Sequence, residues 1–263
     1  MTAAGADLDS QRATAATATG DELTALLHHP SPVVLLALLA NPALDETQLC
    51  ILLERKDLPT EILEEVSGRK PLLKSYRVKR ALAFHVRTPR LIGLRLLRDL
   101  YLMDLVQVTL SPAVNAELKR NAEDQVLARL PQLPLGQKIT LARRGPSRVA
   151  GALLAEGHTQ ILPVVLDNAN LTEAQVLKAL SREKTSPAVP QSIANHRKWS
   201  HAYNVRLALL RNPASSLSAI LAFLPQLTVS DLRELAAPGI VAENLRRYLL
   251  AEIQRRVSGR QKP

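Results

Sequence analysis

The segments LANPALDETQL (39–49) and LDNANLTEAQV (166–176) carry five identical residues at matching positions. The alignment extends without a gap over 39–126 and 166–253, so that each position n of the first copy matches position n + 127 of the second, with 19 identities in 88 positions. About eight identities are expected by chance in a chain so rich in Leu. The sequence therefore predicts an internal duplication with a constant offset of 127 positions.

The apolar residues recur at spacings of three and four, as Val78, Ala81 and Leu82 do in YRVKRAL (76–82). This spacing is typical of amphipathic helices. Aromatic residues make up only 3% of the chain while Leu and Ala dominate, and this composition favours helices over sheets. Helices of about 8 to 12 residues cannot bury their apolar side alone and must stack on neighbours. We predict an all-α fold, an α-solenoid in which about fifteen short antiparallel helices form one superhelix.

A recurring pattern, LLxNPxLxxxxL followed by a second short helix, is carried best by residues 36–66 and 163–193 and again by VRLALLRNPASSLSAILAFL (205–224). This pattern resembles leucine-rich repeat variant proteins and, more loosely, HEAT-like repeats. The resemblance covers about half of the chain. It implies a right-handed superhelix that serves as a binding scaffold and brings no catalytic residues, and the cysteine cluster of some variant-repeat proteins is missing here.

The domain organisation follows from the duplication and from changes in composition along the chain. Helices are expected at 135–144, 147–156 and 159–167, because this joining stretch is as apolar and periodic as the two copies. The predicted segments are a disordered lead (1–20), a first helical half (21–127), joining helices continuous with the core (128–165), a second half (166–257) and a basic tail (258–263).

Five pairs of a cap residue and Pro mark boundaries between these helices: Asn41-Pro42, Thr88-Pro89, Ser111-Pro112, Ser186-Pro187 and Asn212-Pro213. Asn, Ser or Thr accepts a hydrogen bond from an unpaired amide of a first helical turn, and Pro at the first helical position removes only an amide that is unpaired anyway. We therefore predict that a helix starts at each pair.

A single cysteine, Cys50, excludes an intramolecular disulfide and any site that needs several thiolates. This suits a reducing compartment, and we expect a cytoplasmic protein. No run of about 18 apolar residues is present, so we predict no membrane span. The first twenty residues match neither a secretory signal nor an anchor.

The net charge is +10, and the basic residues are unevenly distributed. Residues 69–98 hold ten cations and no acid, and residues 184–230 repeat this with five cations and no acid. Such runs are either an ordinary solvated face or a basic ridge that binds a polyanion. The predicted contact residues for a partner are Arg69, Lys70, Lys74, Arg77, Lys79, Arg80, Arg197, Lys198, Trp199 and Arg206.

The matched pairs Tyr76/Tyr203 and Asp104/Asp231 have structural interpretations. A Tyr ring packed between helices would place its hydroxyl on a backbone carbonyl. Each Asp would support the first turn of a helix. Cys50 lies among apolar residues and is expected to be a small buried hydrophobe.

The sequence contains no Gly-rich phosphate loop, GxSxG or HExxH motif, and we expect no enzyme, metal or cofactor. The favoured function is a scaffold or adaptor for a protein or peptide tail. The first alternative is a sequence-tolerant binder of double-stranded nucleic acid, because too few aromatic residues are present to stack single strands. The second is an enzyme similar to the HEAT-like DNA glycosylases, with Trp199, Tyr203 and Arg206 at its site.

Overall fold

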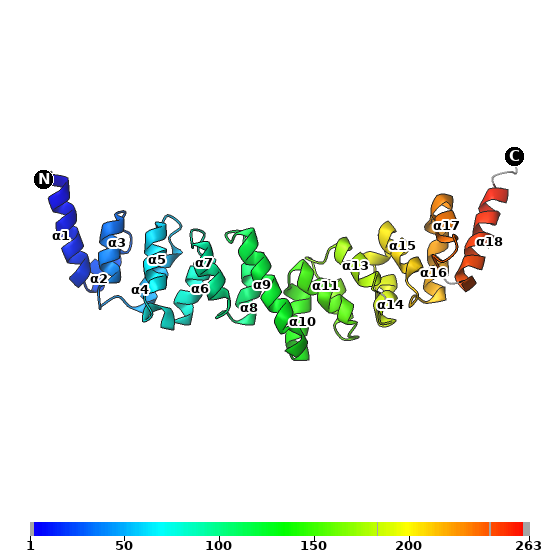
Figure 1. Ribbon diagram of the computed structural model, residues 1–263, viewed down its shortest axis with the longest axis horizontal. Helices are drawn as coiled ribbons and strands as arrows, with labels where there is room; N and C mark the ends of the chain where they lie inside the picture. Colours follow the sequence, from blue (N-terminus) through cyan, green and yellow to red (C-terminus); the bar gives the residue numbers. More distant parts are fainter. Residues whose placement is uncertain (1–2, 183, 242, 260–263) are drawn as a thin grey trace. The chain divides into compact units, whose positions relative to one another are not determined.

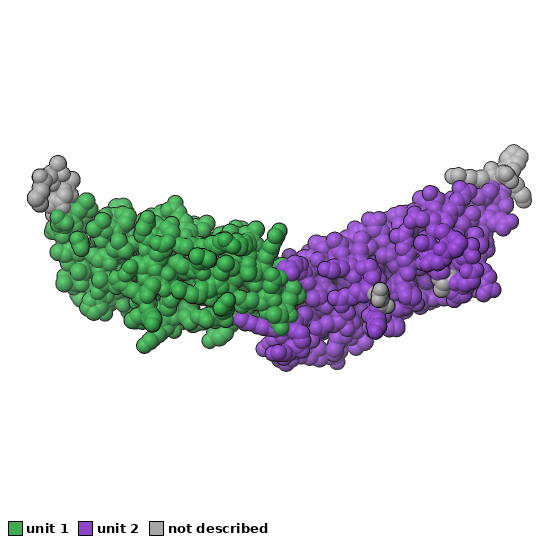
Figure 2. Space-filling model, in the orientation of Figure 1, with its two compact units in different colours: residues 1–128 green, residues 129–263 purple. Residues whose placement is uncertain are grey.

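The structure is a computed structural model that describes residues 3–182, 184–241 and 243–259 (Figure 1). Eighteen α-helices and four short 3-10 helices account for the regular structure of these residues, which contain no strand. The chain is therefore all-α, as the composition predicts. It divides into two compact units, residues 1–128 and residues 129–263 (Figure 2).

The helices of unit 1 are short, and most contain seven to nine residues. They are α1 (Ala3–Thr17), α2 (Gly20–Leu26), α3 (Pro32–Leu39), α4 (Glu46–Glu54), α5 (Thr60–Gly68), α6 (Tyr76–Phe84), α7 (Arg90–Leu97), α8 (Leu102–Leu110) and α9 (Ala116–Arg129), with the 3-10 turn η1 (Leu72–Lys74) before α6.

These helices pack in two layers. Helices α1, α3 and α5 follow one another in the first layer, and α4, α6 and α8 follow one another in the second (Figure 1). Fully buried Leu and Ile side chains fill the space between the layers, among them Leu35, Leu52, Ile62 and Leu82. Each helix is too short to be stable alone, so its apolar stripe is buried by the helices before and after it.

Unit 2 has the same construction. Its helices are α10 (Leu135–Arg144), α11 (Ser147–Glu156), α12 (Leu162–Leu166), α13 (Glu173–Leu180), α14 (Ala188–Asn195), α15 (Tyr203–Arg211), α16 (Leu217–Phe223), α17 (Val229–Leu235) and α18 (Glu243–Gly259), with the 3-10 turns η2 (Leu130–Gln132), η3 (Trp199–His201) and η4 (Leu224–Gln226). Helices α10, α12 and α14 form one layer, and α11, α13 and α15 form the other.

Helix starts in the two units agree with the sequence offset. Six helices of unit 1 have a counterpart in unit 2 whose first residue lies at the offset of 127 positions, and η3 begins at the same offset from η1. The pairs are α2 and α11, α4 and α13, α6 and α15, α7 and α16, α8 and α17, and α9 and α18.

Asn41 is 4% exposed and joins three segments of unit 1. Its Nδ2 donates to the carbonyls of Ala15 (3.0 Å) and Ala18 (2.8 Å) at the end of α1. Its Oδ1 accepts the N–H of Ala43 at 2.8 Å, which fixes the turn before α4. The side chain thus supplies donors to carbonyls that the end of a helix leaves unpaired.

Asn168 makes the same contacts in unit 2, where its Nδ2 donates to the carbonyls of Ala142 (2.7 Å) and Gly145 (3.2 Å). These acceptors are the counterparts of Ala15 and Ala18 at the sequence offset. Asn212 is also buried and donates to the carbonyl of Leu180 at 2.6 Å. The three Asn residues are therefore bridges between successive helical segments.

The predicted helix starts at the Asn-Pro pairs are wrong. Helix α4 begins at Glu46 and is capped by Asp45, whose side chain accepts the N–H of Gln48 at 2.7 Å. Helix α16 begins at Leu217 and is capped by Ser216. In both places the Asn-Pro pair lies in the preceding turn, because the Asn amide bonds to an earlier segment instead of the next helix.

The expectation of a disordered lead over residues 1–20 also differs from the structure. Residues 3–17 form α1, which packs against α3. Ala15 and Ala18 are buried, and their carbonyls accept from Asn41. Ala has the highest intrinsic helix propensity, and its small side chain lets α1 lie close to α3. Residues 1–2 lie outside the described residues.

The joining stretch 128–165 is helical where expected, since α10 and α11 match the predicted bounds and α12 is shorter. These helices pack within unit 2. The predicted basic tail overlaps α18, which continues to Gly259, and residues 260–263 lie outside the described residues.

Replacing Asn41 by Ala should lower the free energy of unfolding by about 1–3 kcal/mol, because the carbonyls of Ala15 and Ala18 lose their buried donor. Urea unfolding followed by circular dichroism measures the change. Asn168→Ala should have a similar effect. The control is Asn121→Ala, which removes only a bond within α9 and should change stability by less than about 0.5 kcal/mol. Equal effects of Asn41→Ala and the control would contradict the bridging role.

Candidate binding clefts

The run 69–98 contains no acidic residue, but packing brings carboxylates from segments before and after it close to its cations. Half of its ten cations form ion pairs with such residues. The pairs are Arg69–Glu65 (2.6 Å), Arg77–Glu46 (3.5 Å), Lys79–Asp99 (2.6 Å), Arg80–Asp104 (2.7 Å) and Arg90–Glu117 (2.5 Å). These exposed or half-exposed pairs contribute little to stability, but they neutralise much of the predicted ridge.

Several arginines of the run donate to backbone carbonyls instead. Arg69 Nη1 donates to the carbonyl of Leu39 at 2.6 Å, at the end of α3. Arg87 Nη1 donates to the carbonyl of Asp57 at 3.0 Å. Lys70 and Lys74 are exposed on the surface. Several cations of the run are therefore engaged within the protein, whereas Lys70 and Lys74 remain exposed.

The aromatic candidate of the second run is part of the core. Trp199 is 3% exposed, and its Nε1 donates to the carbonyl of Leu166 at 2.9 Å. The Lys198 ammonium lies 4.2 Å from the centre of the indole ring, a cation–π contact. Arg206 donates from Nε to the carbonyl of Ser200 at 2.6 Å. Arg197, like Lys198, is exposed.

Tyr76 links η1 and α6 to the start of α8. Its hydroxyl donates to the carboxylate of Asp104 and accepts the N–H of Tyr101 at 3.0 Å. The predicted backbone carbonyl partner is therefore wrong, because the carboxylate in the first turn of α8 takes that place. Burial and the bond to Asp104 raise the pKa of Tyr76, since both disfavour the charged phenolate.

Tyr203 repeats this arrangement in unit 2. Its hydroxyl donates to Asp231 and accepts the N–H of Thr228 at 3.4 Å. Asp231 and Thr228 form a capping box at the start of α17, as expected for an acid in the first turn. The hydrogen bonds from Thr228 and Tyr203 lower the pKa of Asp231 by stabilising its charged form.

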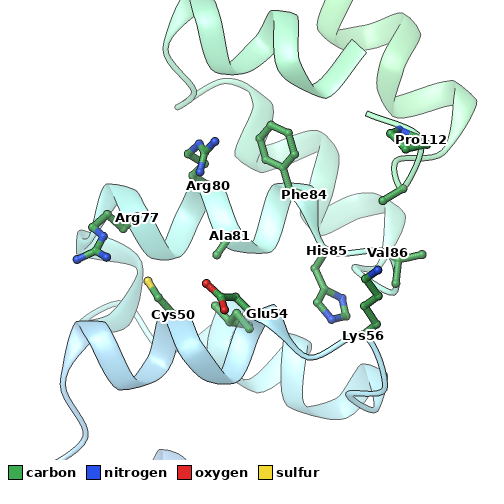
Figure 3. Close-up of a pocket in the computed structure, with 12 residues that line it drawn as sticks. Cys50, Glu54, Lys56, Arg77, Arg80, Ala81, Phe84, His85, Val86 and Pro112 are labelled. Atoms are coloured by element: carbon green, nitrogen blue, oxygen red, sulfur yellow. The ribbon is translucent and has the colours of Figure 1, made fainter. Parts of the chain in front are cut away.

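A cleft of about 670 Å³ lies in unit 1 between α4 and α6, reaching the turn after α8 (Figure 3). Its floor is apolar, with Leu53 and Ala81 between the two helices. Figure 3 shows Cys50 and Arg77 at one end and His85 with Lys56 at the other. The remaining lining residues are Glu54, Arg80, Phe84, Val86, Pro112 and Ala113.

Unit 2 has a cleft of about 550 Å³ at the equivalent place, between α13 and α15. Nine of its ten lining residues lie 127 positions after a residue that lines the first cleft. Ala208 corresponds to Ala81, Leu180 to Leu53 and Asn212 to His85. The same hollow therefore recurs in both units.

The two clefts are lined from equivalent positions, but by different side chains. Arg77 is replaced by Asn204, and Arg80 is replaced by Leu207. The first cleft is lined by three cations and the single acid Glu54. The second cleft therefore carries no charge at these two positions.

His85, which lines the first cleft, is fixed by hydrogen bonds at both of its ring nitrogens. Its Nδ1 accepts the N–H of Arg87, so its Nε2 carries the proton that it donates to the carbonyl of Arg55 at 2.7 Å. Cys50 is half-buried, and burial raises the pKa of its thiol. The thiol is therefore a wall residue and not an activated nucleophile.

Within the described part of the chain, no group of three His, Cys, Asp or Glu residues is placed to hold a metal ion. None of the described helices is both long and apolar enough to cross a membrane.

Comparison with known proteins gives no match. No family model, curated protein or solved structure is significantly similar to the chain. The two clefts are therefore interpreted from their own residues alone.

Of the predicted contact residues, only Arg77 and Arg80 line either of these two clefts. Sequence reasoning missed the other lining residues because they include core leucines and turn residues whose types carry no binding signal. One signal could have found them: Ala is retained at both 81 and 208, on surface-facing positions where a large side chain would fill the hollow.

Asp231 should make unit 2 sensitive to acid. Since its pKa is lowered on folding, its contribution to stability is present above the ordinary pKa of 3.8 and is lost as the pH falls below it. Unfolding free energies measured from neutral to acidic pH should fall less steeply for Asp231→Asn. The control Glu173→Gln removes a charge in unit 2 while keeping an acceptor for Asn204. An unchanged acid profile in Asp231→Asn would refute this assignment.

Proposed function

We propose that the chain is an α-solenoid that arose by internal duplication at the offset of 127 positions, and that it serves as a non-catalytic scaffold for a partner protein. The partner segment binds in the cleft between α4 and α6 and in the equivalent cleft between α13 and α15. Stacked helical repeats commonly use such surfaces to hold extended partners. The resemblance to leucine-rich repeat variant and HEAT-like proteins supports this fold class.

One observation carries the proposal: a cleft recurs at the same place in both units with different side chains. Packing alone would let a surface side chain fill each hollow, yet Ala stands at 81 and at 208. Meanwhile Arg77 and Arg80 have become Asn204 and Leu207. A retained hollow with altered chemistry is expected of two subsites that contact different parts of a partner.

The alternatives have less support. A binder of double-stranded nucleic acid needs cations presented together to phosphates. Here Lys79 pairs with Asp99, and Arg69 and Arg87 donate to carbonyls of other helices. A glycosylase site built on Trp199 is disfavoured, since that indole is buried and bonded to the backbone.

Peptide selection on the full chain tests the scaffold proposal. A displayed library of random peptides is selected against the wild-type chain, and the selected peptides are measured by fluorescence anisotropy. Ala81→Trp fills the first cleft and Ala208→Trp fills the second. Each variant should weaken its own set of peptides by roughly tenfold or more, because the indole occupies the binding space.

The two variants control for each other, because each leaves the opposite cleft open and circular dichroism verifies that both fold. Selected peptides that bind the double variant Ala81→Trp/Ala208→Trp as tightly as the wild type would overturn the proposal. A mobility shift of duplex DNA at about 50 mM salt that weakens steeply at about 200 mM salt, together with no selected peptide, would favour the nucleic-acid alternative, because phosphate contacts are lost as salt rises.

A further inference from the structure

We propose that the cleft of unit 1 is specific for an acidic segment of a partner protein that also carries an apolar side chain. This inference rests on the proposed function and names the chemistry of one of its two subsites. The carboxylates of the segment bind Arg77 and Arg80, and its apolar side chain rests on Ala81 and Phe84 (Figure 3).

The two arginines are held at the cleft and still have donors to offer. Arg80 Nε pairs with Asp104 at 2.7 Å, and its Nη2 donates to Gln107 at 2.9 Å. Arg77 Nη1 lies 3.5 Å from Glu46. A guanidinium has five N–H donors, so each keeps free donors for a carboxylate. Holding Arg80 in advance reduces the entropy that it loses on binding, whereas Arg77 is more exposed.

Phe84 and Ala81 supply the apolar part of the site. The Arg80 guanidinium lies 5.1 Å from the centre of the Phe84 ring, which places a positive charge beside an apolar surface. An acidic residue next to Leu or Phe in the partner matches this arrangement. A duplex phosphate backbone has no apolar group to place against Ala81 and Phe84.

Glu54 favours a polypeptide over a nucleic acid. Its exposed carboxylate lines the same cleft. It repels phosphates, which offer no donor, but accepts the backbone N–H groups of a peptide. Three cations, Lys56, Arg77 and Arg80, also line this cleft, and Glu54 is the one acid among the lining residues. Since Arg77 and Arg80 also pair with Glu46 and Asp104, the carboxylates of the peptide bind the remaining N–H donors of the two guanidinium groups.

The equivalent cleft of unit 2 provides the internal contrast. The positions of Arg77 and Arg80 hold Asn204 and Leu207 there. Arg182 and Arg211 line that cleft, but neither stands at the position of Arg77 or Arg80. We therefore assign the site built on Arg77 and Arg80 to the first cleft only.

The test uses a short peptide that alternates Asp with Leu and Phe, and a matched peptide in which Asn replaces every Asp. Binding to the full chain is measured by fluorescence anisotropy. Alkylation of Cys50, the only cysteine, is followed at about pH 8.5, because the thiol lies in the cleft and has a raised pKa. The acidic peptide should bind and slow this alkylation, whereas the Asn peptide should do neither.

The double variant Arg77→Gln/Arg80→Gln should weaken binding of the acidic peptide by about tenfold, as expected when two half-exposed charged contacts are lost. The matched control Lys70→Gln/Lys74→Gln removes the same charge from exposed positions of unit 1 outside this cleft. The affinity of this control variant for the acidic peptide should change by less than about twofold. Since Arg80→Gln also breaks the pair with Asp104, Arg77→Gln alone is a second variant that should weaken binding on its own.

Three results would overturn the inference. The first is equal weakening in both double variants, which indicates diffuse charge attraction. The second is equal binding of the acidic and Asn peptides. The third is protection of Cys50 by duplex DNA but not by peptide. Equal binding of the two peptides, blocked by Ala81→Trp, would overturn the acidic preference while leaving the scaffold proposal intact.

Discussion

The structure depends on side chains that donate to the carbonyl groups left unpaired at the ends of short helices. Each α-helix leaves its last four carbonyls without an internal partner, and this chain has many such ends in each unit. The donors come from about thirty residues further along the chain. Asn41 and His85 act in this way in unit 1, and Asn168, Trp199 and Asn212 do so in unit 2. These bonds fix the register of one helical segment on the next.

This constraint also explains part of the basic composition. Arg has five donors on a long side chain, so it can reach a carbonyl while its stem packs on apolar surface. Arg55 donates to the carbonyls of Leu27 and His29, and Arg256 donates to those of Leu224 and Leu227. Positive charge in this chain is therefore partly structural.

In the two units, equivalent backbone carbonyls accept hydrogen bonds from different side chains. Arg69 donates to the carbonyl of Leu39, and Trp199 donates to that of Leu166, which is the counterpart of Leu39 in the second copy. The backbone acceptor is the same while the donor has changed in charge and shape. The clefts follow this rule, since the hollow recurs but its chemistry differs. Matching backbone positions of the two units thus carry different side chains.

The sequence by itself determined the all-α class and the constant offset between matching helices. It also determined the bounds of the helices at 135–144 and 147–156, because apolar periodicity and cap residues act over a few neighbouring positions. Only the tertiary structure decided that cations of residues 69–98 form ion pairs with acidic residues outside this run. It also decided that Arg77 and Arg80 line the same cleft as Cys50. Those contacts join residues about 20 to 30 positions apart, which only helix packing brings together.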